Sequence, residues 1–354
     1  MADDQSANPL PDGVEKLDDD EPAPLQADLP PEIASPLKPF AGAKPPAPDW
    51  FEKVLAFEPE RSLVPVNGAN IELLAWGEVG KPGLIFVHGN SAHADWWSFI
   101  APFLAGDYRV ASLSLSGMGD SDWRETYTFE GFASEIHECA RAAGLYEAPV
   151  KPIYIGHSFG GSQVFYSAGM HPERMRAAVL VDTGFGGPPT KEQEEQWAKE
   201  ARRAGHQHRG PPHRTRPNRV YATLEEALTR FRFMPPQVPG NLYIADFIAR
   251  RSLKRAPMAD GSGEGWTWKF DPFLWAKLDR SAMQQAAKKH NVPMAQIAGS
   301  RSAIMQRREM GQQADFIPKG VPSIMIPDSE HHIMVDQPLA LVAALRALLA
   351  VWPA

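Results

Sequence analysis

A tight turn between a strand and a helix is encoded near residue 158, and it constrains the possible folds more than any other feature of the sequence. The letters IYIGHSFGG (residues 153–161) place a run typical of a buried strand before the pattern G-x-S-x-G, and apolar residues up to Gly169 suit a helix. Glycines are needed because the turn leaves no room for a Cβ near the serine, which is held strained with its Oγ exposed at a helix N-terminus. A chance match in a loop would lack the flanking strand and helix. Ser158 is therefore predicted to be a nucleophile.

Short apolar runs alternate with helical patterns from residue 60 onward, which predicts an α/β fold with a mostly parallel central sheet flanked by helices. Two early strands are joined by Asn67-Gly68, a hairpin signal. The strands are expected at 63–66, 71–76, 83–87, 108–115, 153–155, 177–181, 292–298 and 323–326. Amphipathic helices are expected at 129–143 and 338–352.

Residues 186–285 lack this alternation of strands and helices. Gly- and Pro-rich interruptions divide the segment, namely GGPP, RGPPH, MPPQVPG and ADGSGEG. We interpret it as a helical insertion between two parts of one core, residues 47–185 and 286–354.

A basic stretch within this insertion, residues 202–219, contains His206, His208 and His213. These histidines do not predict a metal site, because the stretch has no carboxylate and is interrupted by glycine and proline. A solvated surface loop is expected there. Recognition of an acidic substrate by one of its arginines is the alternative.

The first 46 residues are acidic and rich in proline. Residues 1–32 contain ten acidic side chains against only Lys16, so they contribute −9 to the net charge of −7 and leave +2 for the rest of the chain. Such sequence buries too little apolar area to offset its ordering entropy. Residues 1–46 are therefore predicted to form a disordered arm, either a solubilising tail or a segment that binds a partner.

Charge, cysteine content and apolar runs exclude several classes of protein. The nearly neutral remainder does not resemble a nucleic-acid-binding surface. A single cysteine, Cys139, excludes an internal disulfide framework and a cysteine-based zinc site. The start MADDQSANPL lacks the regions of a secretory signal, and the longest apolar stretch, 339–352, is shorter than the roughly 20 residues that span a membrane. We expect a cytoplasmic protein with no membrane partner, as a monomer or homodimer that the sequence does not distinguish.

A second turn, His88-Gly89-Asn90, follows the strand expected at 83–87. Acyl transfer needs two hydrogen-bond donors aimed at the oxygen on which negative charge develops. We assign these donors to the backbone N–H groups of Asn90 and Phe159, the residue after the serine. The alternative is that His88-Gly89-Asn90 only terminates the strand.

Five motifs, VHGN, SGMGDS, GHSFGG, VLVDTG and HHIMVDQP, resemble the α/β-hydrolase family over roughly residues 60–354. The resemblance places the insertion where this family carries a cap. It also implies the chain order Ser, acid, His for the catalytic residues, and no metal or organic cofactor.

The resemblance implies a catalytic histidine near the C-terminus, at one of two neighbours, His331 and His332. Family members commonly place it seven residues before the proline that opens the last helix. Counting back from Pro338 favours His331, and His332 would then occupy the place of a pocket aromatic.

The acid is expected after a strand, at one of two places. Many relatives have it in a G-x-x-D pattern, but here the corresponding residues 299–302 end in Ser302. Some families place the acid one strand earlier, and Asp182 in VLVDTG matches that place. We predict Asp182 as the catalytic acid, the alternative being an aspartate that caps the turn. Weaker candidates are Glu309, Asp328 and Glu330.

The favoured function is hydrolysis of a carboxylic ester or lactone of a small to medium, fairly apolar molecule through an acyl-enzyme. Trp96 and Trp97, which follow the second turn, are predicted to wall the substrate pocket. Two alternatives remain: a carbon–carbon bond hydrolase of aromatic catabolism, and a ligand-binding homologue without turnover. Haloalkane dehalogenases and epoxide hydrolases share the fold, but their nucleophile is an aspartate, and Ser158 argues against both.

Overall fold

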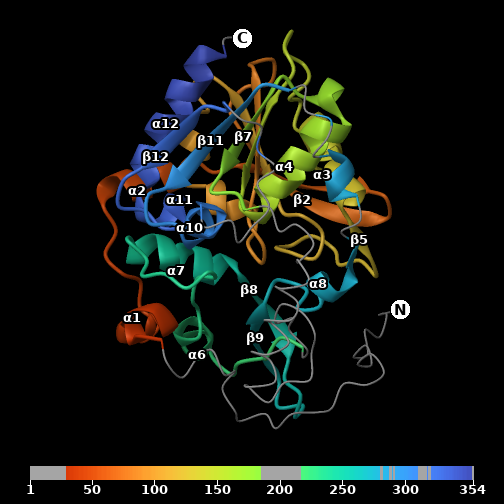
Figure 1. Cartoon of the computed structure of the whole chain (residues 1–354). Coiled ribbons are helices and arrows are strands. Elements are labelled where there is room, and N and C mark those ends of the chain that lie inside the picture. Colours follow the sequence, from red (N-terminus) through yellow and green to blue (C-terminus); the bar gives the residue numbers. More distant parts are fainter. Residues whose placement is uncertain are drawn as a thin grey trace.

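An eight-stranded sheet forms the centre of the molecule in the computed structural model (Figure 1). The structure describes residues 29–184, 217–279, 282–286, 289, 292–309, 317 and 320–352. In spatial order the strands are β1 (Glu60–Val66), β2 (Ala69–Trp76), β4 (Arg109–Leu113), β3 (Gly83–Val87), β6 (Ile153–His157), β7 (Ala177–Val181), β11 (Met294–Gly299) and β12 (Ser323–Ile326). Pairing is antiparallel for β1–β2 and β2–β4 and parallel for the rest, so the predicted α/β class with a mostly parallel sheet is confirmed.

The burial of each strand follows its place in the sheet. All residues of β3, β4, β6, β7 and β11 are buried, as expected for parallel strands covered on both faces. The edge strand β1 is largely exposed. Its turn to β2 has positive φ at Asn67 (47°) and Gly68 (79°), the conformation that the hairpin signal predicts.

Helices cover both faces of the sheet (Figure 1). Side chains of α3 (Phe129–Ala142) and α4 (Phe159–Met170) share one apolar cluster, and α2 (Asp49–Leu55) and α12 (Pro338–Val351) contribute to the other. Short helical turns complete the core, at η2 (Ala94–Trp97), η3 (Ala101–Phe103), η4 (Pro172–Arg174), α9 (Met283–Ala286), α10 (Ala303–Glu309) and α11 (Ile333–Asp336). No helix within the described ranges is long and apolar enough to cross a membrane.

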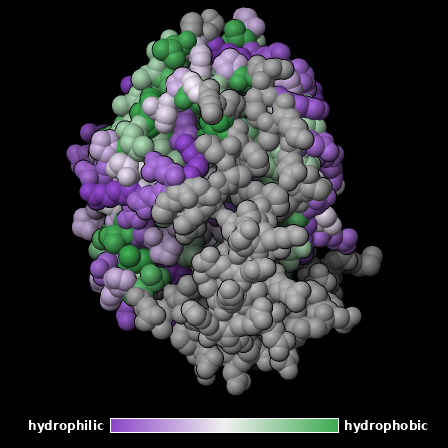
Figure 2. All heavy atoms as spheres, viewed as in Figure 1, coloured by the Kyte–Doolittle hydropathy of each residue, from purple (hydrophilic) through white to green (hydrophobic). Residues whose placement is uncertain are grey.

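The surface seen in Figure 2 mixes hydrophilic and hydrophobic side chains. Exposed large apolar side chains among the described residues come from distant parts of the chain, and they include Phe57, Leu63, Trp123, Met325 and Val351. Apolar surface residues of this scattered kind are ordinary in globular proteins.

The segment inserted between β7 and the short core helix α9 lies beyond one end of the sheet (Figure 1). Its described elements are α6 (Leu224–Thr229), α7 (Leu242–Arg251), β8 (Leu253–Pro257), β9 (Glu264–Trp268), α8 (Leu274–Lys277) and β10 (Leu278–Asp279). It is not entirely helical, because β8 and β9 form an antiparallel pair and β10 pairs with β5 (Tyr127–Thr128). The Gly-rich letters ADGSGEG (residues 259–265), interpreted above as an interruption, form most of the turn between β8 and β9 and the first two residues of β9. The remainder of the predicted insertion at 186–216, including most of the basic stretch with its three histidines, lies outside the described residues. We call the described insertion, residues 217–279, the cap.

The disordered arm predicted for residues 1–46 does not extend over residues 29–46. Residues 29–46 contain α1 (Pro31–Ala34) and η1 (Lys38–Phe40), and Leu37 between them is only 2% exposed within an apolar cluster. The guanidinium of Arg250 in the cap donates to the carbonyl of Gly42 over 2.7 Å. The proline-rich composition of this region did not predict the burial of Leu37. Residues 1–28 lie outside the described part of the chain.

Candidate active site

Ser158 lies at the sharp turn between β6 and α4, with φ 53° and ψ −117°. Backbone segments lie so close together in this turn that two of its glycines leave no room for a Cβ. A Cβ at Gly156 would lie 2.4 Å from the carbonyl oxygen of Gly160, and a Cβ at Gly160 would lie 2.4 Å from that of His88. A non-glycine residue with positive φ is strained, and such strain is common at functional sites.

The structure brings Ser158, His331 and Asp182 together in one chain of hydrogen bonds. His331 Nε2 lies 2.9 Å from Ser158 Oγ, and His331 Nδ1 lies 2.8 Å from Asp182 Oδ1. Because a carboxylate only accepts, Nδ1 carries the proton and Nε2 is free to accept from the serine hydroxyl. Asp182 directly follows β7, and His331 lies in the loop between β12 and α11.

Asp182 is fully buried, and two further groups hold its carboxylate in place. The N–H of Gly299 donates to Oδ2 over 2.8 Å, and the Ser302 hydroxyl donates to Oδ1 over 2.5 Å. Ser302 Oγ in turn accepts from the N–H of Ile304 at the start of α10. These donors fix the orientation of the carboxylate toward His331.

The two residues whose N–H groups are predicted to bind an oxyanion follow β6 and β3, which are parallel neighbours in the sheet. Phe159 is the first residue of α4, so its N–H has no acceptor inside the helix. Asn90 follows β3 and is exposed. Neither N–H has a backbone acceptor among the described residues.

His88 braces the turn that carries Asn90. Its Nε2 accepts from the N–H of Leu115 over 3.0 Å, so Nδ1 carries the proton and donates to the carbonyl of Gly89 over 2.7 Å. Burial lowers the pKa of His88 to about 3, which keeps the ring neutral. The bond to Leu115 joins the turn after β3 to the segment after β4 and the bond to Gly89 lies within the turn, in keeping with the strand-terminating role considered for this turn, and the binding of an oxyanion by Asn90 stays a prediction.

Two neutral histidines flank His331. His157 Nε2 donates to the carbonyl oxygen of His331 over 2.9 Å, and His332 Nδ1 donates to Oε1 of Gln237 over 2.6 Å. Burial lowers the pKa of both His157 and His332 well below the ordinary value. Neither ring therefore adds positive charge beside His331 near neutral pH.

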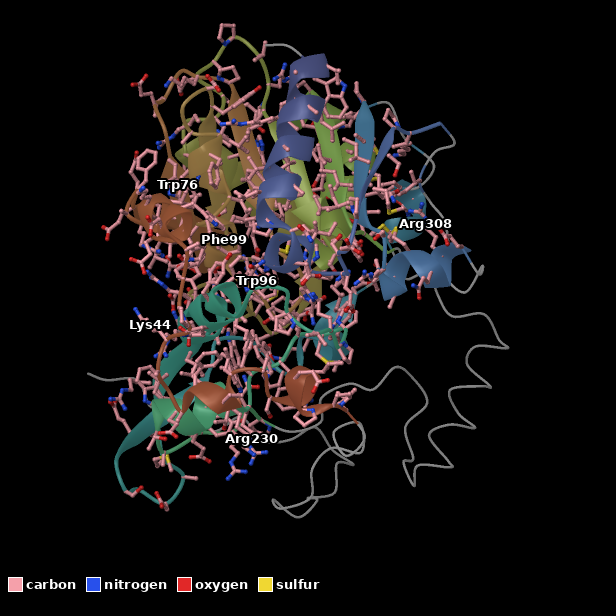
Figure 3. The ribbon with its side chains drawn as sticks, turned by 90° about the vertical axis from the view of Figure 1, so that its left-hand side faces the viewer. Lys44, Trp76, Trp96, Phe99, Arg230 and Arg308 are labelled. Atoms are coloured by element: carbon pink, nitrogen blue, oxygen red, sulfur yellow. The ribbon has the colours of Figure 1, made fainter. Side chains whose placement is uncertain are left out.

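Three aromatic rings meet at the border between core and cap. His332 lies 5.4 Å from Trp96 and 4.9 Å from Phe233, measured between ring centroids. Figure 3 places Trp96 where the sheet faces the cap helix α7. Trp97 does not join this group: it is fully buried in the core, with its ring 4.7 Å from Phe86. Consecutive residues of the tight turn η2 point in different directions, so only one of the two tryptophans reaches the border.

Two residues of this network were missed by the sequence interpretation. Gln237 stands in the proline-rich letters MPPQVPG, which predict only a loop. Ser302 was noted as the residue that replaces an aspartate, and its bond to Asp182 was not foreseen. The presence of serine where an aspartate was expected was the one signal in the sequence, because a polar side chain at position 302 can hydrogen-bond the carboxylate of Asp182.

A family model described as the alpha/beta hydrolase fold matches residues 82–338. The chain belongs to the α/β-hydrolase fold family. A match over this length, together with the sheet order and the serine turn, agrees with the resemblance found in the sequence motifs.

The relatives of this α/β hydrolase differ in their named activities. A fluoroacetate dehalogenase of Burkholderia sp is 29% identical over 129 residues, which cover 35% of this chain and 40% of the relative. A pimeloyl-[acyl-carrier protein] methyl ester esterase of Klebsiella pneumoniae (strain 342) is 31% identical over 108 residues, 30% of this chain and 39% of the relative. The chain thus matches about two fifths of the length of these curated relatives.

Solved structures agree on the fold. A thioesterase domain from the curacin biosynthetic pathway superposes with a TM-score of 0.59 at 20% identity, covering 81% of this chain and 99% of that one. A likeness at this level of identity supports the architecture alone.

Proposed function

We propose that this α/β hydrolase is a serine hydrolase that cleaves a carboxylic ester or lactone through an acyl-enzyme. The observation that carries the proposal is the continuous path from Ser158 Oγ to His331 and on to Asp182, with distances of 2.9 and 2.8 Å. This path is the arrangement that acyl transfer requires of a nucleophile, a general base and a group that orients the base.

In the acylation step, Ser158 Oγ attacks the ester carbonyl carbon while its proton passes to His331 Nε2. Asp182 keeps the Nδ1 proton in place and stabilises the imidazolium that forms. The N–H groups of Asn90 and Phe159 donate to the oxyanion of the tetrahedral intermediate. Collapse of the intermediate expels the alcohol, which takes the proton from Nε2, and leaves the acyl group on Oγ.

In the deacylation step, water attacks the acyl carbon and gives a proton to His331 Nε2. Collapse of the second intermediate releases the carboxylic acid and returns that proton to Ser158 Oγ. Ester and water are converted into acid and alcohol, or a lactone into a hydroxy acid. This chemistry requires no metal or organic cofactor, and its only required partner is the small-molecule substrate.

The identity of the nucleophile favours this proposal over dehalogenation. Dehalogenases and epoxide hydrolases of the family use an aspartate nucleophile, whereas this chain has Ser158 at the turn. The aromatic group of Trp96, Phe233 and His332 favours a small to medium, fairly apolar substrate. We also propose a cytoplasmic location, because a chain with a single cysteine forms no internal disulfide and suits a reducing compartment.

The test is hydrolysis of nitrophenyl esters and lactones by wild type and Ser158→Ala, together with labelling by a fluorophosphonate. Turnover and labelling that both disappear in Ser158→Ala, with an unchanged melting temperature, are the expected result. A labelled enzyme that hydrolyses no ester or lactone would redirect the proposal to carbon–carbon bond cleavage. A wild type that neither hydrolyses nor labels would overturn the enzyme assignment.

A further inference from the structure

The peptide bond between His331 and His332 is held from two sides. Its carbonyl oxygen accepts from His157 Nε2 over 2.9 Å, and its N–H donates to Gln237 Oε1, also over 2.9 Å. The carbonyl and the N–H of a trans peptide point in opposite directions. His157, which precedes Ser158, and Gln237, which belongs to the cap, therefore fix the plane of this peptide between them.

Gln237 is committed to this loop through both ends of its amide. Besides the N–H of His332, Oε1 accepts from His332 Nδ1 over 2.6 Å, and Nε2 donates to both carboxylate oxygens of Asp336 at 3.1 Å. Gln237 is only 2% exposed. Asp336 also accepts from the N–H of Glu330 over 2.9 Å, so the network holds the loop on both sides of His331.

Other contacts fasten the same cap segment to the core without touching this peptide. The N–H of Gly240 donates to Asp336 Oδ1 over 3.0 Å. Asn241 Nδ2 donates to the carbonyls of Val335 and Asp336, over 2.8 and 3.1 Å. Gln237 and Asn241 thus both attach the cap segment to α11, but of these two side chains only Gln237 also bonds the His331–His332 peptide, which allows the two roles to be separated by experiment.

We propose that Gln237 is a positioning residue for His331. By holding the N–H of the following residue, it sets the direction of the His331 side chain, so that Nε2 stays at Ser158 while Nδ1 stays at Asp182. Since Gln237 belongs to the cap, a displacement of this cap segment relative to α11 would also displace the His331 imidazole. The part of this inference that concerns activity rests on the proposed serine-hydrolase function.

The first test compares Gln237→Met with Asn241→Leu, two near-isosteric changes in one cap segment. Gln237→Met removes the acceptor at the peptide, and we expect kcat to fall about tenfold to hundredfold, because small displacements of a catalytic group are costly. KM is expected to change less than about threefold, since the lost interaction orients the base and does not bind the substrate. Asn241→Leu is expected to keep kcat within about twofold.

Equal losses of kcat in the two variants would overturn the inference, since they would mean that Gln237 acts only by attaching the cap. Melting temperatures of both variants are recorded alongside. A wild type without hydrolysis or labelling would overturn the proposed function, and it would leave the positioning to the second test.

The second test does not depend on activity. In protein labelled with ¹⁵N-histidine, the His331 Nδ1–H resonance is identified by its disappearance in His331→Gln. The hydrogen bond to Asp182 is expected to protect this proton from exchange in wild type and in Asn241→Leu, and to do so less in Gln237→Met. An unchanged resonance and exchange rate in Gln237→Met would overturn the positioning role.

Discussion

Ser302 donates its hydroxyl hydrogen to Asp182 Oδ1, the same oxygen that faces His331 Nδ1 at 2.8 Å. The two positions meet because β7 and β11 are parallel neighbours, with Val181 opposite Ile297. Residues that follow the two strands therefore meet beside one imidazole: Asp182 bonds it directly, and Ser302 bonds Asp182. The family resemblance implies an acid after one of these two strands, and in this chain the residue expected after β11 is a serine that hydrogen-bonds Asp182.

This relationship predicts that the acid can be moved. Asp182→Asn is expected to lower kcat about 10³- to 10⁴-fold, because the amide no longer holds the imidazole in the correct tautomer. Adding Ser302→Asp is expected to restore at least about tenfold of the loss, because the longer side chain brings a carboxylate toward Nδ1. Ester hydrolysis at saturating substrate measures both. A double variant as inactive as Asp182→Asn, although folded by circular dichroism, would contradict the prediction.

Ser302 is also expected to contribute to stability. Ser302→Ala removes a hydrogen bond to a buried carboxylate and leaves the N–H of Ile304 without this acceptor. A loss of about 1.5–3 kcal/mol in the free energy of unfolding is expected from such a bond to a charged group. Urea denaturation measures the loss. Ser300→Ala, at an exposed neighbour, is the control, and an equal effect of the two substitutions would argue against the prediction.

Much of the fold and part of the site could be predicted from short-range patterns. The buried strands, the hairpin at Asn67-Gly68 and the turn at Ser158 are each encoded within a few neighbouring residues, where backbone geometry restricts the choice of side chain. The contact between Gln237 and His332 spans 95 residues and has no local signature, because any loop can carry a glutamine. This contact therefore could not be predicted from the sequence.

Buried neutral histidines predict a loss of stability in acid. Burial lowers the pKa of His93 to about 4 in the folded protein, whereas it is about 6.5 when unfolded. Between these two values only the unfolded chain binds the proton, so the folded state is destabilised as the pH falls below 6.5. The buried acids Glu72 and Glu135 oppose this trend, because burial raises their pKa.

A comparison with His93→Gln isolates this effect. Gln replaces the Nε2–H that reaches Ser252 Oγ at 2.9 Å, but it does not titrate. The stability difference between wild type and variant is expected to be constant above pH 7.5. At pH 5 the free energy of unfolding of wild type should be lower, relative to the variant, by about 2 kcal/mol compared with pH 7.5. The slope between the two pKa values is about 1.4 kcal/mol per pH unit. Urea unfolding across this range measures it, and parallel curves for the two proteins would refute the assignment.

The tight serine turn predicts a strong dependence on its glycines. Gly156→Ala is expected to prevent folding or to cost more than about 3 kcal/mol, because the new Cβ meets backbone atoms of Gly160 that cannot move aside. Gly106→Ala is the control, since a Cβ there meets no atom within 4 Å. Thermal melts of the two variants decide the matter, and similar melting temperatures would contradict the description of the turn.

The ordered part of the N-terminal region is expected to stabilise the contact between core and cap. In α2, the ring of Phe51 lies 4.8 Å from Tyr243 of the cap and 5.9 Å from Phe99 of the core, and Leu37 is buried in the same apolar cluster. Leu37→Ala is therefore expected to cost about 2–4 kcal/mol, as buried leucines do. Leu63→Ala, at a side chain that is 57% exposed, should change stability by less than about 0.5 kcal/mol. Urea denaturation compares the two, and an equally small loss for Leu37→Ala would mean that residues 29–46 rest on the surface without stabilising it.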